Sequence, residues 1–332
     1  MKPSRREFIG TGIGAAGAAA IATGASTFWA APSRADDWRP FAEAGRVAKA
    51  MHESPLDGID MKPAVAGEML ERAVTQLTGE ANAADAWRRL IRRDDRVALK
   101  PNGLGGRQLA THKELIDATI EALLGIGVPP ENITIYEQFS GFLRNCRVRA
   151  NNVPEGVVTA VHRNQDAPRA WTSVPSGRTK YVTSLLDATA VIAFPIAKDH
   201  SIAGITGALK NMTHGSIVNP HEFHRHGASP QIAELYAHEA IRSRMRLQVL
   251  DATRVLCNGG PQDSPPFRRN GDSIYVSTDP VALDAIAIAL VETDRRARRL
   301  PSLERRGTPP AHVAAAAALG LGVADPRRIQ IV

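Results

Sequence analysis

The stretch that decides the fold reads AVIAFPIAKDHSIAGITGALKNMTHG and runs from Ala190 to Gly215. Its early residues, Val191 to Phe194, form an unbroken apolar run, which is the pattern of a strand buried on both faces. Pro195 has no N–H to donate, so the strand is predicted to end there. Polar residues punctuated by glycines follow, and ligands of open α/β sheets bind where strands end and loops begin. The sequence therefore places its best site candidate in a polar loop after this strand.

Strands and helices alternate on the amino-terminal side of this stretch. A short strand at 97–99 leads to Lys100, a helix follows over 111–125, and the next strand, 132–136, ends at Glu137. Strand, helix and strand of these lengths form a right-handed βαβ unit with parallel strands. We therefore expect an α/β fold with a mainly parallel sheet flanked by helices. Four polar residues follow apolar runs and should lie at carboxyl-terminal strand ends on one side of that sheet: Lys100, Glu137, Lys198 and Asp251.

The amino terminus is predicted to be a targeting signal rather than part of the fold. SRREFI at positions 4–9 matches the twin-arginine export pattern, and a glycine- and alanine-rich apolar stretch follows over 9–25. The five glycines of that stretch argue against a stable membrane-spanning helix, and the small residues Ser33 and Ala35 predict cleavage before Asp36. Residues 1–35 are therefore predicted to be a twin-arginine signal peptide, with the twin-arginine export machinery as a partner. An uncleaved amino-terminal anchor is the alternative.

The mature chain is expected to be exported or periplasmic, without a stable membrane span after cleavage. Residues 36–93 carry apolar side chains at helical spacing, such as Met69, Ala73 and Leu77, and are expected to form a peripheral helical extension. Residues 94–332 are expected to form the α/β domain.

Composition excludes some functions. The chain has 332 residues and a formal net charge of +7, but it contains no basic run studded with aromatic residues, so nucleic-acid binding is not expected. Cys146 and Cys257 are its only cysteines, so no Cys-x-x-Cys pair can form. A disulfide is permitted in an exported protein, but two buried thiols are the preferred interpretation.

Three lysines lie at predicted strand ends or in the loop after the central strand. Together Lys100, Lys198 and Lys210 would favour a small anionic ligand such as a phosphate or carboxylate, whereas three separate solvated lysines are the other interpretation. The candidate ligand-binding residues are Lys100, Asn102, Asn211 and Asp251. The two asparagines of this set would orient a ligand by hydrogen bonds, or else cap turns.

Five histidines are candidates for a metal site. They follow the central strand: His200, His214, His221, His224 and His226. The spacing His-x-x-His-x-His allows imidazoles to meet at one divalent ion, and Zn, Fe(II), Ni or Mn would suit such ligands. An exposed histidine-rich loop is the other interpretation. His200 is the best placed of the five because it shares the strand-end loop with the lysines.

One carboxylate, that of Asp284, stands out from its surroundings. The segment 281–291 is nearly all apolar and should be a buried helix, which begins with the capping residue Asp279 before Pro280. A carboxylate on a buried helix needs partners such as a lysine or a metal ion. We therefore hypothesise that Asp284, His200 and Lys210 meet in one pocket, where His200 is a base or a metal ligand.

Several of these motifs in their order resemble one known family. They are KPN at 100–102, FPIAKDH at 194–200, TGALKN at 206–211, VLD at 249–251, GGP at 259–261 and STDPVALDA at 277–285. In this order they resemble the domain-of-unknown-function family numbered 362, over roughly residues 95–292. Many relatives carry iron–sulfur ferredoxin modules, but this chain lacks those cysteines, so no iron–sulfur cluster is expected. The resemblance implies an architecture and a residue set more than a reaction.

Two function classes follow from these observations. The first is an exported enzyme that acts on a small anionic substrate, with or without a metal or other cofactor. Its candidate catalytic residues are Lys198, His200, Lys210 and Asp284. The second is a non-catalytic periplasmic protein that binds a ligand or metal in the same pocket. The acid–base capacity of the residue set favours the enzyme.

Overall fold

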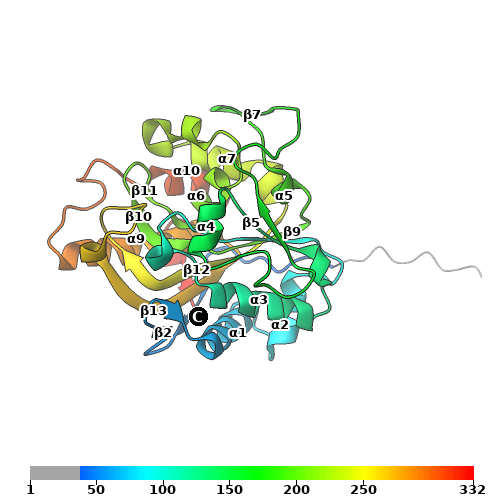
Figure 1. Cartoon of the computed structure of the whole chain (residues 1–332). Coiled ribbons are helices and arrows are strands. Elements are labelled where there is room, and N and C mark those ends of the chain that lie inside the picture. Colours follow the sequence, from blue (N-terminus) through cyan, green and yellow to red (C-terminus); the bar gives the residue numbers. More distant parts are fainter. Residues whose placement is uncertain (1–37) are drawn as a thin grey trace, which may run out of the picture. The chain divides into compact units, whose positions relative to one another are not determined.

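The structure, a computed structural model, describes residues 38–332. One ten-stranded sheet runs through this part of the chain (Figure 1). The predicted signal peptide lies outside the described residues. The strands of the sheet are β1 (Arg46–Met51), β4 (Val97–Lys100), β5 (Ile133–Glu137), β6 (Val158–Val161), β9 (Ala190–Ala193), β10 (Ile196–His200), β11 (Gly204–Ile205), β12 (Met245–Leu256), β13 (Arg268–Ser277) and β14 (Gln330–Ile331). The order across it is β14-β1-β13-β12-β9-β4-β5-β6; β10 also pairs with β12, and β11 pairs with β10.

Most strand pairs are parallel, and helices flank the sheet, so the predicted α/β fold is confirmed. Strands β4, β5, β6, β9 and β12 all run in the same direction. The pairs of β13 with β12 and with β1 are antiparallel. A parallel crossover needs a dozen or more residues and usually a helix, whereas β13 follows β12 after a short connection that contains only one 3₁₀ turn.

Helices cover both faces because the strands alternate their buried side chains. Val97 and Leu99 of β4 pack on one face, while Ala98 between them packs on the other. The first face is covered by α1 (Pro63–Thr78), α2 (Ala83–Leu90) and α3 (Lys113–Gly125). The second is covered by α5 (Thr183–Leu186), α6 (Gly207–His214), α7 (Gln231–Ala237), α8 (Glu239–Arg242), α9 (Pro280–Ala297) and α10 (Ala311–Ala318).

The segment predicted as a peripheral helical extension is only partly helical. It supplies α1 and α2, but Arg46–Met51 forms β1, which pairs with β13 inside the sheet. Val47 and Ala48 of β1 are fully buried on opposite faces. The prediction of a purely helical segment over 36–93 is therefore wrong for these residues, since they need the sheet to bury both of their faces.

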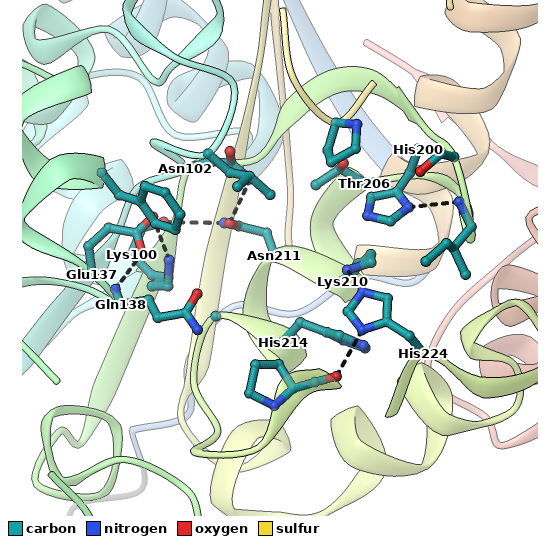
Figure 2. A pocket seen from close by; sticks show the side chains of 17 residues that line it. Lys100, Asn102, Glu137, Gln138, His200, Thr206, Lys210, Asn211, His214 and His224 are labelled. Carbon is teal, nitrogen blue, oxygen red and sulfur yellow. Dashed lines mark hydrogen bonds and ion pairs between the residues drawn. The ribbon is translucent and has the colours of Figure 1, made fainter. Parts of the chain in front are cut away.

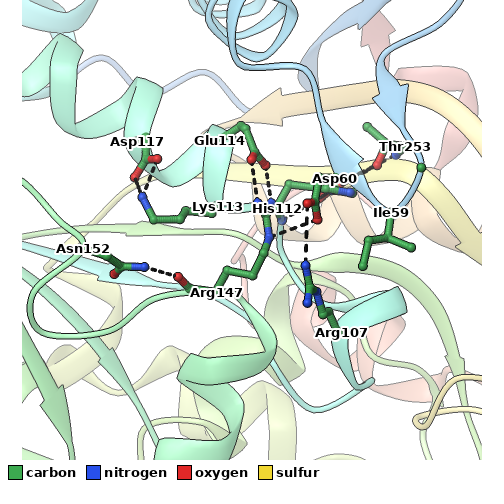
Figure 3. A network of polar contacts seen from close by, with 12 residues as sticks. Ile59, Asp60, Arg107, His112, Lys113, Glu114, Asp117, Arg147, Asn152 and Thr253 are labelled. Atoms are coloured by element: carbon green, nitrogen blue, oxygen red, sulfur yellow. Dashed lines mark hydrogen bonds and ion pairs between the residues drawn. The ribbon is translucent and has the colours of Figure 1, made fainter.

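An ion-pair network ties this segment to α3 (Figure 3). Arg147 places Nη2 2.5 Å from Glu114 Oε2 of α3 and Nε 3.2 Å from Asp60 Oδ1 of β3 (Asp60–Met61). Glu114 is buried, and the two N–H groups of Arg147 fit its two carboxylate oxygens. The network therefore helps to fix β3 against α3.

In the stretch from Ala190 to Gly215, the residues after the first strand do not form the loop that was expected. The apolar run forms β9, which ends before Pro195 as predicted. The following residues are not a loop: they form β10, a short β11 and the helix α6. The site candidate therefore lies on regular elements rather than on a flexible segment.

Two further features bear on the expectations from sequence. Cys146 and Cys257 are buried free thiols, so the preferred interpretation of the cysteines is confirmed. Among residues 38–332, no helix is both long enough and apolar enough to cross a membrane.

Candidate functional site

A cavity of about 330 Å³ opens beside the carboxyl-terminal ends of β4, β5 and β10 (Figure 2). Its polar lining residues are Lys100, Asn102, Glu137, Gln138, His200, Ser201, Thr206, Lys210, Asn211, His214 and His224. Its apolar lining residues are Leu104, Phe142, Ile202, Pro220 and Pro261. Its volume lies at the lower end of the range for small-molecule sites.

Lys100 and Glu137 form the wall at the ends of β4 and β5. Lys100 Nζ lies 3.1 Å from Glu137 Oε1 and donates to the backbone oxygen of Pro101 at 2.8 Å. Glu137 also accepts from the N–H groups of Gly103 and Gln138. Its two oxygens are thus occupied by three donors, so Glu137 offers the cavity little acceptor capacity.

Two asparagines connect this wall to a second lysine. Asn102 Nδ2 donates to Asn211 Oδ1 at 3.1 Å, and Asn211 Nδ2 donates to the backbone oxygen of Lys100 at 3.3 Å. Lys198 Nζ donates to Asn102 Oδ1 at 2.9 Å. Lys198 is fully buried and does not line the cavity, and burial lowers the pKa of its ammonium group to about 7. Lys100 and Lys198 therefore lie on one side of the sheet, as expected, but Lys198 supports Asn102 rather than facing the cavity.

The third lysine, Lys210, faces the cavity from α6. Burial, with a smaller contribution from the charge of Lys198, lowers the pKa of its ammonium group to about 7. Its Nζ lies 3.0 Å from His224 Nε2. His224 Nδ1 lies 2.9 Å from the backbone oxygen of Pro220, which can only accept, so Nδ1 carries the proton of the neutral ring. Lys210 is then the donor to His224 Nε2, and Figure 2 shows the two side chains beside each other.

His200 has the opposite tautomer. Its Nδ1 accepts from the N–H groups of Ile202 at 3.1 Å and Ala203 at 3.3 Å, so the proton of the neutral ring is on Nε2. Burial, followed by the nearby charge of Lys210, lowers the pKa of His200 to about 2. His200 is therefore a neutral hydrogen-bond donor at ordinary pH, and the expectation that it acts as a base is not supported by its surroundings.

The five histidines do not form one metal centre. His214 Nε2 donates to the backbone oxygen of Phe223 and its Nδ1 contacts Thr213 Oγ1, so both ring nitrogens are occupied. His221 and His226 are exposed and do not line the cavity. Within residues 38–332, no three histidine, cysteine, aspartate or glutamate side chains are placed to hold a metal ion. Sequence spacing gave no information on where each ring nitrogen would point.

Asp284 does not join His200 and Lys210 in the cavity. Its Oδ1 accepts from the N–H of Ala208 at 2.5 Å and its Oδ2 from the N–H of Leu209 at 3.1 Å, at the first turn of α6. Burial raises the pKa of its carboxyl group to about 7, although both hydrogen bonds oppose this shift. The partners that a buried carboxylate requires are thus backbone N–H groups rather than a lysine or metal.

Asp251 is also outside the cavity. It lies inside β12 rather than at a strand end, because β12 continues to Leu256 with β13 paired beside it. Its Oδ2 lies 2.7 Å from His112 Nδ1, and its Oδ1 accepts from the N–H and hydroxyl of Thr253. All of its acceptor capacity is directed at these neighbours, so Asp251 fixes the start of α3 instead of binding a ligand.

Sequence reasoning missed some residues that line the cavity. Gln138, Phe142 and Ile202 were not singled out, although Gln138 directly follows the strand-end Glu137. Thr206 lies within the motif at 206–211, and its buried hydroxyl has no hydrogen-bond partner within residues 38–332. That hydroxyl is the clearest sign of an unmet polar contact at the cavity.

Comparison with known families accounts for the architecture. A family model, Domain of unknown function (DUF362), matches residues 97–289, which is more than half of the chain. The chain belongs to this family. The match includes β4, β5 and α6, and every residue that lines the cavity lies within the DUF362 region.

Other comparisons add little. A search of curated proteins finds no match. The solved structure of the lactate racemase apoprotein from Thermoanaerobacterium thermosaccharolyticum is similar at 11% sequence identity with a TM-score of 0.42, over 75% of this chain and 57% of that one. This chain therefore spans little more than half the length of that protein, and a similarity of this size transfers no activity.

Asp284→Asn is expected to destabilise the protein. Asparagine has one oxygen and one NH₂ group, so one N–H of α6 would lose its acceptor and face another donor. We expect the free energy of unfolding in urea to fall by about 2 kcal/mol. Asp117→Asn, which breaks a partly exposed ion pair with Lys113, is the control and should cost less than about 1 kcal/mol. Equal losses in the two variants would show that α6 does not depend on Asp284.

Lys210→Met should change how stability depends on pH. The pKa of Lys210 is about 7 in the folded protein and about 10.5 in an unfolded chain, so the folded state binds fewer protons between these values. The free energy of unfolding of the wild type should therefore rise relative to Lys210→Met from pH 7 towards pH 10, by at most about 1.4 kcal/mol per pH unit. Urea denaturation at several pH values measures this, with Lys180→Met as the control. Parallel curves for wild type and Lys210→Met would contradict the lowered pKa.

Proposed function

We propose that this protein is an enzyme that acts on a small anionic substrate, with the amine of Lys210 as the reacting group. The observation that carries the proposal is the contact of Lys210 Nζ with a neutral imidazole nitrogen at a cavity wall, where burial brings its pKa to about 7. An amine with a pKa near the working pH is available in both its protonated and its neutral form.

The cavity has many donors and few acceptors, which favours an anion. Lys100, Lys210 and the Nε2–H of His200 can each donate into it. Its one carboxylate, Glu137, is already occupied by three donors. A carboxylate or phosphate group would therefore satisfy donors that otherwise lack partners.

The state of Lys210 favours an enzyme over a binding protein. A protein that only binds an anion gains most from a lysine that stays fully charged. Lys210 instead contacts a neutral imidazole, and no carboxylate within residues 38–332 forms an ion pair with it. Such burial makes the amine a weaker anchor for charge but a better nucleophile or proton acceptor.

Chemical labelling with cyanate tests this proposal. Cyanate is small and carbamylates neutral amines, so at pH 7.5 Lys210 should react at least about 10-fold faster than Lys180, which lies on a loop outside the cavity. Oxalate, a small dianion, should protect Lys210 but not Lys180. Mass spectrometry of peptides measures both rates. Equal rates at the two lysines, or the absence of protection by oxalate, would contradict the proposal.

We further propose that the protein reaches the periplasm or cell exterior through the twin-arginine route, on the basis of the SRREFI segment at 4–9. Replacing both Arg5 and Arg6 by lysine should retain the full chain in the cytoplasm, because the pathway reads the arginine pair. Cell fractionation and immunoblotting measure this. A variant exported as efficiently as the wild type would contradict the proposed route.

A further inference from the structure

We propose that Lys210 forms an imine with the carbonyl carbon of its substrate, and that this substrate is a small aldehyde or ketone bearing a carboxylate, such as a 2-oxo acid. This inference rests on the proposed function and specifies its chemistry. It depends on three arrangements at the cavity: the bonding of the amine, the tautomer of His200 and the position of the other donors.

The first arrangement leaves the amine free to attack. One N–H of Lys210 is directed at His224 Nε2, which can accept only because the backbone oxygen of Pro220 fixes the proton on Nδ1. In the neutral amine, the lone pair must then point away from His224. Lys210 lines the cavity, so the lone pair is available to a bound carbonyl carbon.

The second arrangement supplies a donor for the carbonyl oxygen. The ring of His200 stacks on that of His224, with 5.8 Å between ring centroids, and its Nε2–H has no partner within residues 38–332. Both His200 and Lys210 thus flank the same imidazole. A neutral N–H donor next to the attacking amine stabilises the negative charge that develops on the carbonyl oxygen.

The third arrangement accommodates a carboxylate. Lys100 and Asn211 line the cavity together with Lys210, and Asn102 is held by Lys198. These groups supply amide and ammonium donors away from the two histidines. A 2-oxo acid has a carbonyl directly bonded to a carboxylate, so it matches an amine and an anion site within one small cavity.

The reaction balances without any further reagent. The amine nitrogen of Lys210 bonds to the carbonyl carbon and gives a carbinolamine. The carbon–oxygen bond then breaks, and the oxygen leaves as water with the two hydrogens that the amine nitrogen carried. The product is an imine between Lys210 and the substrate carbon, and protonation from solvent gives the iminium ion.

Reductive trapping with glyoxylate and cyanoborohydride tests the inference on the full chain. Glyoxylate is a small 2-oxo acid, and cyanoborohydride converts its imine to a stable secondary amine. At pH 7.5 we expect a single adduct on Lys210, at least about 10-fold more than on Lys180, because an ordinary lysine is almost entirely protonated there. Oxalate should suppress the adduct, and uncharged acetaldehyde should give much less of it.

Matched variants make the outcome decisive. Lys210→Arg should abolish the adduct, whereas Lys180→Met should retain it, with the folded state of each variant checked by thermal denaturation. Adducts spread evenly over the lysines, or an adduct that persists in Lys210→Arg, would overturn the inference. Suppose that cyanate labels Lys210 and that oxalate suppresses this labelling, but glyoxylate gives no adduct on Lys210. The imine is then refuted, and the proposal of an enzyme that binds an anionic substrate stands. Failure of both reagents at Lys210 would refute both.

Discussion

The carboxylate of Asp284 beneath the first turn of α6 is the interaction on which the site depends. All eight residues of α6 are buried, including Lys210, Asn211 and His214, so its first N–H groups cannot be satisfied by water. Asp284 accepts from two of them, and in its ionised form its negative charge is stabilised by the positive end of the helix. Gly207 starts the helix with φ of +56°, and a β-carbon there would overlap the carboxylate. This close approach fixes where α6 begins and hence which of its side chains face the cavity.

Burial of a polar helix then sets the charge state of the site. Lys210 and Lys198 both lose the solvation of their ammonium groups, which lowers both pKa values. The charge of Lys198 also lowers the pKa of Lys210, and the charge of Lys100 lowers that of Lys198. Burial of an ammonium group costs much less when a carboxylate is paired with it, because the attraction between the two charges offsets part of the lost solvation. Lys100 has such a partner in Glu137, whereas Lys198 bonds to Asn102 and Lys210 to His224. The three lysines that look equivalent in the sequence are therefore different in chemistry.

The sequence predicts the strands of this protein better than it predicts which side chains contact one another. The apolar run at 191–194 and the strand ends at Lys100 and Glu137 are visible because strand periodicity is local. The helix α6 is not visible, since all eight of its residues are buried and several of them are polar, which a sequence pattern reads as an exposed loop. The backbone partners of Asp284 were hidden for the same reason. The pair His112–Asp251 joins residues 139 positions apart, and no local pattern reports such a contact. The roles of the histidines depend on backbone oxygens and N–H groups that only the folded chain brings near them.

These histidines explain how the cavity can hold donors without adding charge. His200 and His224 have low pKa values because they are buried near Lys210, so both remain neutral when Lys210 is protonated and when it is not. Backbone groups hold the proton on Nε2 in His200 and on Nδ1 in His224. One ring is therefore a fixed donor towards the cavity, and the other a fixed acceptor towards the amine. A site built this way needs no rearrangement of its hydrogen bonds when Lys210 gives up its proton, which keeps the cost of reaching the neutral amine low.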